Sequence, residues 1–565
     1  MRRARPTGYR LPNVRRRVAT AGVACMLTAS LAACAASERD SAAGGNDGTM
    51  VFGAAGAPAL FDPFYASDGE TFRVTRQMME GLVGYKPGTA EVQPELATGW
   101  EQSEDGTTWT FQLREGVKFH DGTPFNAEAV CANFERWYNQ TGAGQNSALS
   151  YYWIETFGGF ADDDKPSLYE SCEAPDPTTA VINLARPTSK FPDALGLDSF
   201  SMQSPTAMEK YQANNVRAQG SSFVYSEYAK KHPTGTGPFK FESYNEGNGT
   251  ITLTRNENYW GEKAKLSRLI FKIIPDENVR KEELLAGSID GYDFPNPADL
   301  QSLSDAGFNV QVRDPFNIMY LGITQKNNPA LRDLKVRKAL AYAVDRKNLV
   351  QANLPEGAEV ATQFYPDTVD GYAKDVQKYS HNPEKAKQLL AEAGHSDLTL
   401  RFYWPTQVTR PYMPDPRGIF NAIAGDLRAV GITVEPVSKP WNGGYLDDVN
   451  NARADLFLLG WTGDYNSPDN FIGTFFGSTE NQFYTAAAPW GEDLAKQLQA
   501  ADREPDPAKR EAMYAEINRK LMAQYLPAVP LSHSPPAIVT SKQVKGLQPS
   551  PLTAEEFASV SMSEE

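Results

Sequence analysis

Hydrophobic and polar positions alternate along the whole chain with two different periods. Trp109, Phe111 and Leu113 are separated by polar residues, which is the pattern of a half-buried strand. Asn126 is a typical helix N-cap, and apolar residues follow it at helical spacing. Because strand and helix patterns are interleaved and no long repeat interrupts them, the sequence predicts an α/β fold.

The most clearly marked helix lies in the second half of the chain. Asn382, Pro383 and Glu384 supply a cap, a first-turn proline and an early acidic residue. An apolar stripe follows, and Gly394 is a typical helix end. We therefore expect a helix that begins after Asn382.

A strand, helix and strand pattern follows this helix. We expect a strand over 398–403, a loop over 404–416, a helix over 417–430 and a strand over 432–437. The apolar run 455–461 is typical of a strand covered on both faces, and a polar loop follows it at 463–469. In open α/β sheets, ligands bind beyond the carboxyl ends of strands. These two loops are therefore the candidate ligand-binding loops.

Length and composition restrict the class of protein. A chain of 565 residues suffices for three to four domain-sized units, and 41% hydrophobic with 22% charged residues is ordinary globular usage. The net charge is -15, although residues 1–33 contain arginines and no acidic residue, so the remainder is more acidic still. A nucleic-acid partner is not expected, since binding to its backbone needs basic surfaces.

The amino terminus has the pattern of a lipoprotein export signal. Arginines precede a mild apolar stretch over 18–33, which is too short and too rich in small residues to span a bilayer comfortably. Leu31-Ala32-Ala33-Cys34 resembles a lipobox, in which the cysteine becomes the lipid-modified first residue; an ordinary cleavage site is the alternative. Residues 34–49 are typical of a flexible tether. We expect an exported protein, anchored by lipid at Cys34 to the outer face of the cell membrane.

The four cysteines fit this interpretation. Cys25 would leave with the signal peptide and Cys34 would carry lipid, so Cys131 and Cys172 remain for the folded part. A cysteine pair outside the cytoplasm favours a disulfide, and two buried free thiols are the alternative.

Sequence motifs for catalysis, metals and cofactors are mostly absent. The five histidines are scattered, and the chain has no H-E-x-x-H, Cys-His metal spacing, Walker A or G-x-S-x-G motif. The consecutive acids at 162–164 lack the alternation of a calcium loop. We expect no enzymatic activity, no metal and no cofactor. An enzyme that uses the acids of 464–469 as paired carboxylates is an alternative.

The two candidate loops instead contain opposite charges among aromatic side chains. Arg410 offers a planar guanidinium suited to a carboxylate, and Asp464 offers a partner for an ammonium group. Further candidate ligand-binding residues lie in or beside these loops: Trp404, Trp441, Trp461 and Gly463. Singly, each of the charged and aromatic residues is more often a solvated charge or a core residue, but their joint placement favours a ligand site.

Six motifs, taken in order, give the chain a family resemblance. They are Pro94-Glu95-Leu96-Ala97-Thr98-Gly99-Trp100, the segment 113–125, Gly235-Thr236-Gly237-Pro238-Phe239, and the segments 255–260, 336–346 and 386–394. The sequence thereby resembles the family 5 extracytoplasmic solute-binding proteins of ABC importers, which take dipeptides, oligopeptides or nickel. Arg410-Pro411-Tyr412 and the segments 460–464 and 468–471 resemble the dipeptide-binding members.

The resemblance implies a two-lobed periplasmic-binding-protein (Venus-flytrap) fold. The larger lobe would comprise 50–312 and 527–565, with an inserted subdomain at about 100–230, and the smaller lobe 313–526. The chain would cross between the lobes near Arg313 and Leu526.

The resemblance also implies how a ligand is held. Arg410 would receive the carboxylate of a short peptide and Asp464 its amine. The lobes would close on the peptide, and the protein, a monomer, would deliver it to the ABC permease in the membrane. Haem, nickel or another small solute is the alternative cargo.

Overall fold

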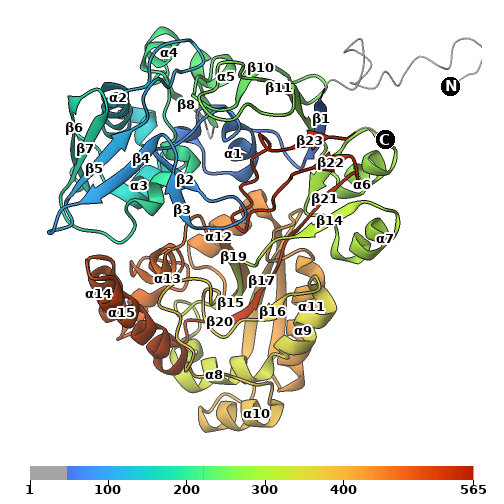
Figure 1. Ribbon diagram of the computed structural model, residues 1–565. Coiled ribbons are helices and arrows are strands. Elements are labelled where there is room, and N and C mark those ends of the chain that lie inside the picture. Colours follow the sequence, from blue (N-terminus) through green and yellow to red (C-terminus); the bar gives the residue numbers. More distant parts are fainter. Residues whose placement is uncertain (1–47, 221, 564–565) are drawn as a thin grey trace, which may run out of the picture. The chain divides into compact units, whose positions relative to one another are not determined.

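Strand pairing divides the chain between two large sheets. The computed structural model describes residues 48–220 and 222–563 (Figure 1). In the first sheet β1 pairs in parallel with β12 and β13, and the other neighbouring pairs are antiparallel. Its order is β10 (Phe239–Asn245), β11 (Thr250–Arg255), β12 (Arg268–Ile273), β1 (Thr49–Ala54), β13 (Gly291–Asp293), β21 (Ala537–Thr540) and β14 (Asn309–Val312).

The second large sheet has six strands and is mixed. Its order is β16 (Glu359–Val360), β20 (Ala528–His533), β15 (Asn317–Ile323), β19 (Leu456–Thr462), β17 (Thr399–Thr406) and β18 (Thr433–Pro440). Strands β19, β17 and β18 run parallel to one another, whereas β15 is antiparallel to β19. Every residue of β15 is buried, as expected for a strand between two neighbours that is covered on both faces.

A smaller antiparallel sheet packs with helix α2 (Ala127–Tyr138). Its order is β4 (Ala97–Gln102), β5 (Thr108–Leu113), β7 (Thr179–Leu184) and β6 (Tyr169–Asp176). Cys131 on α2 and Cys172 on β6 form a disulfide with a Cα to Cα distance of 5.2 Å. The predicted disulfide is therefore confirmed, and it joins a helix to an edge strand of this sheet.

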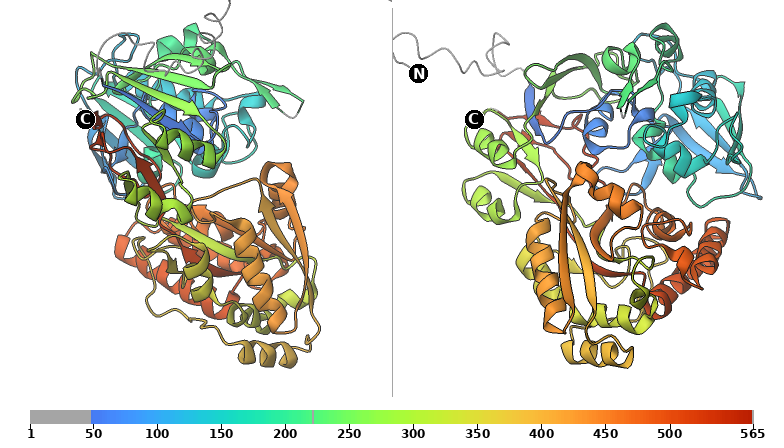
Figure 2. Two further views of the ribbon diagram at one scale, coloured as in Figure 1. Left: turned by 90° about the vertical axis from the view of Figure 1, so that its right-hand side faces the viewer. Right: turned by 180° about the vertical axis from the view of Figure 1, so that it is seen from behind.

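We refer to the part built around the seven-stranded and four-stranded sheets as the larger lobe, and to the part around the six-stranded sheet as the smaller lobe. Figures 1 and 2 show the helices of the smaller lobe gathered around its sheet. The larger lobe also contains α1 (Gly69–Thr75), α3 (Tyr151–Phe157), α4 (Pro205–Lys210), α5 (Glu227–Lys231), α6 (Glu277–Leu285), α7 (Leu300–Asp305), and the strand pairs β2 (Val83–Tyr85) with β3 (Val92–Pro94), β8 (Arg217–Gln219) with β9 (Ser222–Val224), and β22 (Val544–Lys545) with β23 (Ser561–Met562). The smaller lobe contains α8 (Leu334–Ala343), α9 (Arg346–Asn353), α10 (Pro383–Glu392), α11 (Pro416–Ala429), α12 (Leu446–Asn450), α13 (Ile472–Phe476), α14 (Gly491–Asp502) and α15 (Pro507–Lys520).

The helix starts expected from the sequence are confirmed. The side chain of Asn126 accepts a hydrogen bond from the backbone of Ala129 at the start of α2, and Asn382 accepts one from Lys385 at the start of α10. Both caps satisfy a backbone N–H group that has no partner within the helix. Trp109, one of the alternating residues of β5, is buried as the pattern predicts.

The chain passes between the seven-stranded and the six-stranded sheet twice, at 313–316 and at 534–536. Arg313 begins the first of these segments and is buried, with ion pairs to Asp293 at 2.8 Å and Glu555 at 2.6 Å. Strand β20 belongs to the smaller lobe's sheet because it pairs with β15, so the second change of sheet follows His533. The lobe boundaries near Arg313 and Leu526 stay a prediction.

Two further expectations concern the export signal and membrane-spanning segments. The signal peptide, Cys25 and Cys34 lie outside the described residues. Within the described part of the chain, no helix combines the length and the apolar character needed to cross a membrane.

Candidate functional site

Three neighbouring strands of the smaller lobe end at the same edge of its sheet. The loop after β17 carries Arg410, the segment after β18 begins with Trp441, and the loop after β19 carries Asp464. Because these strands are parallel neighbours, their carboxyl ends emerge side by side. The strand arrangement that placed both candidate loops at one edge is therefore confirmed.

The carboxylate of Asp464 is held by hydrogen bonds from both lobes. The Tyr152 hydroxyl, on α3 of the larger lobe, donates to Oδ1 over 3.1 Å. Within the smaller lobe, the Asn470 amide donates to Oδ2 over 3.3 Å, and its oxygen accepts from the Asp464 backbone N–H over 2.8 Å. A carboxylate has about four lone-pair positions, so two remain for a ligand.

Burial dominates the electrostatics of Asp464. Removal from water raises the pKa of this carboxyl to about 6, and the negative charges of Asp198 and Glu155 act in the same direction. The hydrogen bonds from Asn470 and Tyr152 oppose the shift. At neutral pH Asp464 is an ionised, largely desolvated carboxylate, which a ligand ammonium group would stabilise.

A cavity of about 330 Å³ opens beside Asp464. Its walls come from α3 and the segment 186–190 of the larger lobe, and from 461–480 and α14 of the smaller lobe. Trp461 lines this cavity, and its indole N–H donates to the Asn470 side-chain oxygen over 3.2 Å. Trp461 and Asp464 are therefore brought together by one buried amide.

The basic groups of this cavity are already paired. The Lys190 ammonium lies 2.9 Å from the carboxylate of Asp469, and Arg186 lies 3.2 Å from that of Asp502. Asp502 also accepts hydrogen bonds from Thr188 and Ser189. These contacts join the two lobes next to Asp464 and leave its charge without a cationic partner among the described side chains.

Arg410 lies in a different setting. Its guanidinium carbon is 4.4 Å from the centre of the Trp441 ring, and its Nε is buried without a hydrogen-bond partner. No carboxylate among the described residues forms an ion pair with it. Arg410 lines a small cavity of about 80 Å³ that shares no residue with the cavity at Asp464. The guanidinium is thus available to an external acceptor.

Two of the predicted site residues have clear packing roles. Trp404 belongs to strand β17 and not to the predicted loop, because β17 pairs with β18 as far as Thr406. Its ring stacks on Phe420 of α11 with centroids 5.3 Å apart, and it does not line the cavity at Asp464. At Gly463 a Cβ atom would lie 2.2 Å from the Phe316 ring, so only glycine fits there.

Sequence reasoning missed the larger lobe's share of this site. Tyr152 and Tyr85 contact Asp464 from far away in the chain, the Tyr85 hydroxyl lying 3.1 Å from the Asp464 backbone oxygen. Neither tyrosine lies in a motif that indicates this role. Asn470 does lie in the segment 468–471, which carried the resemblance to dipeptide-binding proteins, and that was the available signal.

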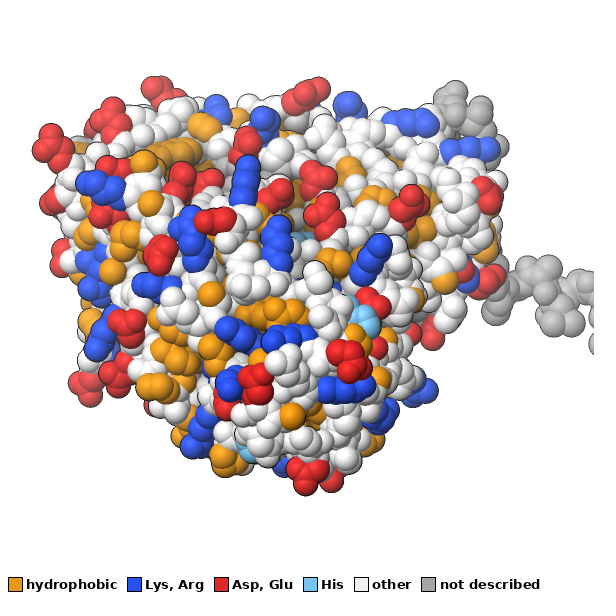
Figure 3. All heavy atoms as spheres, turned by 90° about the horizontal axis from the view of Figure 1, so that it is seen from below, with side chains coloured by type: hydrophobic (Ala, Val, Ile, Leu, Met, Phe, Trp, Pro, Cys, Tyr) orange, Lys and Arg blue, Asp and Glu red, His pale blue; other side chains and the backbone are white. Residues whose placement is uncertain are grey.

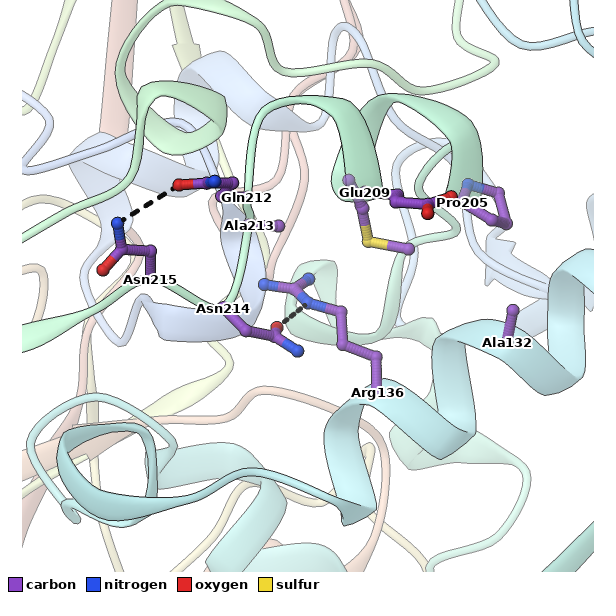
Figure 4. A pocket seen from close by; sticks show the side chains of 9 residues that line it. Ala132, Arg136, Pro205, Glu209, Gln212, Ala213, Asn214 and Asn215 are labelled. Atoms are coloured by element: carbon purple, nitrogen blue, oxygen red, sulfur yellow. Dashed lines mark hydrogen bonds between the residues drawn. The ribbon is translucent and has the colours of Figure 1, made fainter.

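Other features of the surface do not resemble this site. A cavity of about 360 Å³ in the larger lobe surrounds Arg136 (Figure 4), whose side chain is already paired with Asp62 and bonded to Asn214. On the face shown in Figure 3, Lys and Arg side chains are interspersed with Asp and Glu. Among the described residues, no group of three or more His, Cys, Asp or Glu side chains is arranged to hold a metal ion.

Comparison with known proteins adds independent information. Residues 91–483 match the model of the bacterial extracellular solute-binding proteins, family 5 middle. The dipeptide-binding protein of Escherichia coli is 33% identical over 527 residues, covering 91% of this chain and 94% of that one. Heme-binding protein A of Haemophilus influenzae is 31% identical over 525 residues, covering 92% and 93%.

Solved structures show the same architecture. The dipeptide-binding protein of Pseudoalteromonas in complex with Met-Leu superposes with a TM-score of 0.76 at 26% identity, covering 91% of this chain and 100% of that one. The predicted two-lobed α/β fold is confirmed, and so is the predicted family resemblance. The chain belongs to the family 5 bacterial extracellular solute-binding proteins of ABC importers.

Proposed function

We propose that this protein captures short peptides between its lobes and delivers them to a membrane permease. Asp464 receives the peptide amine and Arg410 the peptide carboxylate, while Trp441 and Trp461 form apolar walls. The ligand is carried and not converted. Closure around the ligand is what the permease recognises, because only the closed form brings both lobes to the peptide.

One observation carries this proposal. Asp464 and Arg410 follow adjacent parallel strands and carry opposite charges. The Asp464 carboxylate has acceptor positions left for a ligand, and the Arg410 Nε–H group has no hydrogen-bond partner. A desolvated carboxylate and a guanidinium without a carboxylate partner are stabilised by the ammonium and carboxylate ends of one zwitterionic peptide. The dipeptide-binding relatives support the same cargo.

The location follows from the sequence and the family. We propose that residues 1–33 are removed, that Cys34 carries the lipid, and that the folded part works as a monomer at the outer face of the cell membrane. Stable anchoring would need two acyl chains, since one chain binds membranes only marginally. A Cys34→Ala variant is expected to leave the detergent phase in a phase-partition assay; a variant that stays there would contradict the lipid anchor.

Calorimetry with blocked peptides tests the binding mode. A dipeptide with free ends is expected to bind, an N-acetylated one to lose the Asp464 contact, and a C-amidated one to lose the Arg410 contact. Acetylation of the dipeptide should lower its affinity for wild type. It should hardly lower the already reduced affinity of Asp464→Ala, as a double-mutant cycle requires. Equal binding of free and blocked peptides would contradict the terminal-anchor mechanism.

Haem is the second candidate, because Heme-binding protein A is a relative of similar identity. The lining of the cavity at Asp464 contains three tyrosines and no histidine. Titration with haem, followed by its absorbance, separates the two cargoes: a saturable spectral shift without peptide binding would favour haem. Native mass spectrometry of protein purified from its host would identify the bound mass directly.

A further inference from the structure

The loop that carries Asp464 is fastened to the larger lobe by three tyrosines. Tyr465 is buried within the hydrophobic cluster of the larger lobe, with only 6% of its surface exposed. The hydroxyl of Tyr85 lies 3.1 Å from the Asp464 backbone oxygen. The hydroxyl of Tyr152 reaches the carboxylate itself. The candidate amine anchor therefore lies within the contact between the lobes.

Tyr152 is held rigidly on its own side of this contact. Its ring is 9% exposed, and it packs against Phe72 and Tyr151 with centroids 5.9 Å and 5.1 Å apart. A side chain packed in this way loses little further freedom when its hydroxyl forms a bond. The position of the hydroxyl is consequently set by the larger lobe.

Asn470 provides the matching support on the other side. It is 4% exposed, and its amide contacts the backbone N–H and the Oδ2 of Asp464 and the indole of Trp461. Oδ2 is thus oriented within the smaller lobe, whereas Oδ1 is bonded across the lobes. The two oxygens of this carboxylate are therefore bonded to two different lobes.

We propose that Tyr152 is a positioning residue that couples the amine-binding state of Asp464 to the joining of the lobes. This inference rests on the proposed function. The Tyr152 bond orients Oδ1, so that the remaining lone pairs face the cavity where a ligand ammonium would lie. Ligand and lobe contact then stabilise the same rotamer of Asp464, and each favours the other.

The first test measures peptide affinity by calorimetry, with a dipeptide whose amine is free or acetylated. Tyr152→Phe removes the hydroxyl and retains the ring. Because a hydrogen bond to a charged group is lost, affinity for the free dipeptide is expected to fall by about 10- to 100-fold. The acetylated dipeptide should lose much less, which a purely structural role of Tyr152 would not produce.

Tyr138→Phe is the matched control. Tyr138 lies on α2 of the same lobe, packs against Trp153 and Tyr169, and does not line the cavity at Asp464. The Tyr138→Phe variant should bind the free dipeptide within about twofold of wild type, because the ring is retained and the lost hydroxyl lies away from the cavity at Asp464. Equal affinities for Tyr152→Phe and Tyr138→Phe would overturn the inference.

The second test needs no ligand and so separates this inference from the proposed function. Tyr152→Phe, Asp464→Ala and the double variant are unfolded with urea, and the free energies form a double-mutant cycle. A bond between the two side chains predicts that the changes are not additive. Additive changes would overturn the inference, even in a protein that proves to bind haem and no peptide.

Discussion

The two candidate anchors, Asp464 and Arg410, differ in their surroundings. Asp464 is bonded to side chains of both lobes, and burial raises its pKa. Arg410 stacks on Trp441 of its own lobe, and its Nε has no partner. The side chain proposed to receive the carboxylate is thus held by a contact within one lobe, although residues of both lobes line its cavity. The carboxylate proposed to receive the amine is itself hydrogen-bonded across the lobes. Closure should therefore affect the amine end more strongly.

The largest expected effect comes from removing either anchor. Asp464→Ala or Arg410→Ala should weaken dipeptide binding by roughly 30-fold to several thousand-fold, because truncating one partner of a buried charged contact costs about 2 to 5 kcal/mol. Calorimetry measures the loss. If the two ends differ as described, Asp464→Ala should also change the interlobe distance measured by fluorescence transfer, and Arg410→Ala should not. The comparison fails if both variants behave alike in that second measurement.

Acidification should weaken the amine end alone. Since the pKa of Asp464 is about 6, the carboxyl becomes protonated below that pH and loses its attraction for an ammonium group. Dipeptide affinity should fall roughly 100-fold between pH 7 and pH 4, and Asp464→Asn should remove this dependence. A wild-type affinity that is flat over this range would contradict the assignment of the amine to Asp464.

Protonation of Asp464 should have opposite effects on ligand affinity and on the stability of the fold. A carboxyl whose pKa is raised in the folded protein takes up its proton more readily when folded than when unfolded. Its contribution to the free energy of unfolding is therefore largest below the unfolded pKa of about 4. That contribution is lost as the pH rises through about 6. The difference in the free energy of unfolding between wild type and Asp464→Asn should show this trend when it is measured by urea unfolding at each pH.

A smaller effect is expected at the carboxylate end. Trp441→Leu removes the aromatic face beneath Arg410 and should weaken dipeptide binding roughly 2- to 30-fold, the range of a cation–π contact. Trp404→Leu is the matched control, since that ring stacks on Phe420 instead. Equal losses for both variants would show that Trp404 also forms a wall of the site.

The smallest effect on binding is expected from the disulfide. Replacing Cys131 and Cys172 with Ser should lower the free energy of unfolding by roughly 2 to 5 kcal/mol. The affinity for the dipeptide should remain unchanged, because the disulfide joins α2 to β6 and lines neither the cavity at Asp464 nor the cavity at Arg410. A loss of affinity in the folded variant would show that the four-stranded sheet helps to position α3.

Several parts of the fold could be predicted because their cause is local. The helix caps at Asn126 and Asn382 depend on residues within one helical turn. The alternation in β5 depends on a few consecutive residues of one strand. The parallel strands that place Arg410 and Asp464 at one edge also follow from a short strand, helix and strand pattern. Trp404 was misplaced because the end of β17 depends on its pairing with β18, which the local pattern does not contain.

The sequence by itself determined the family, the α/β class and the cysteine pair, and it singled out the two charged candidate residues, because each is carried by contiguous motifs or by residue counts. Only the tertiary structure decided which side chains surround Asp464. Tyr85 and Tyr152 reach it across more than 300 positions of the chain, and Lys190, paired with Asp469, lines the same cavity. Burial creates the pKa shift, and burial is a property of packed neighbours, so no local pattern of residues can specify it.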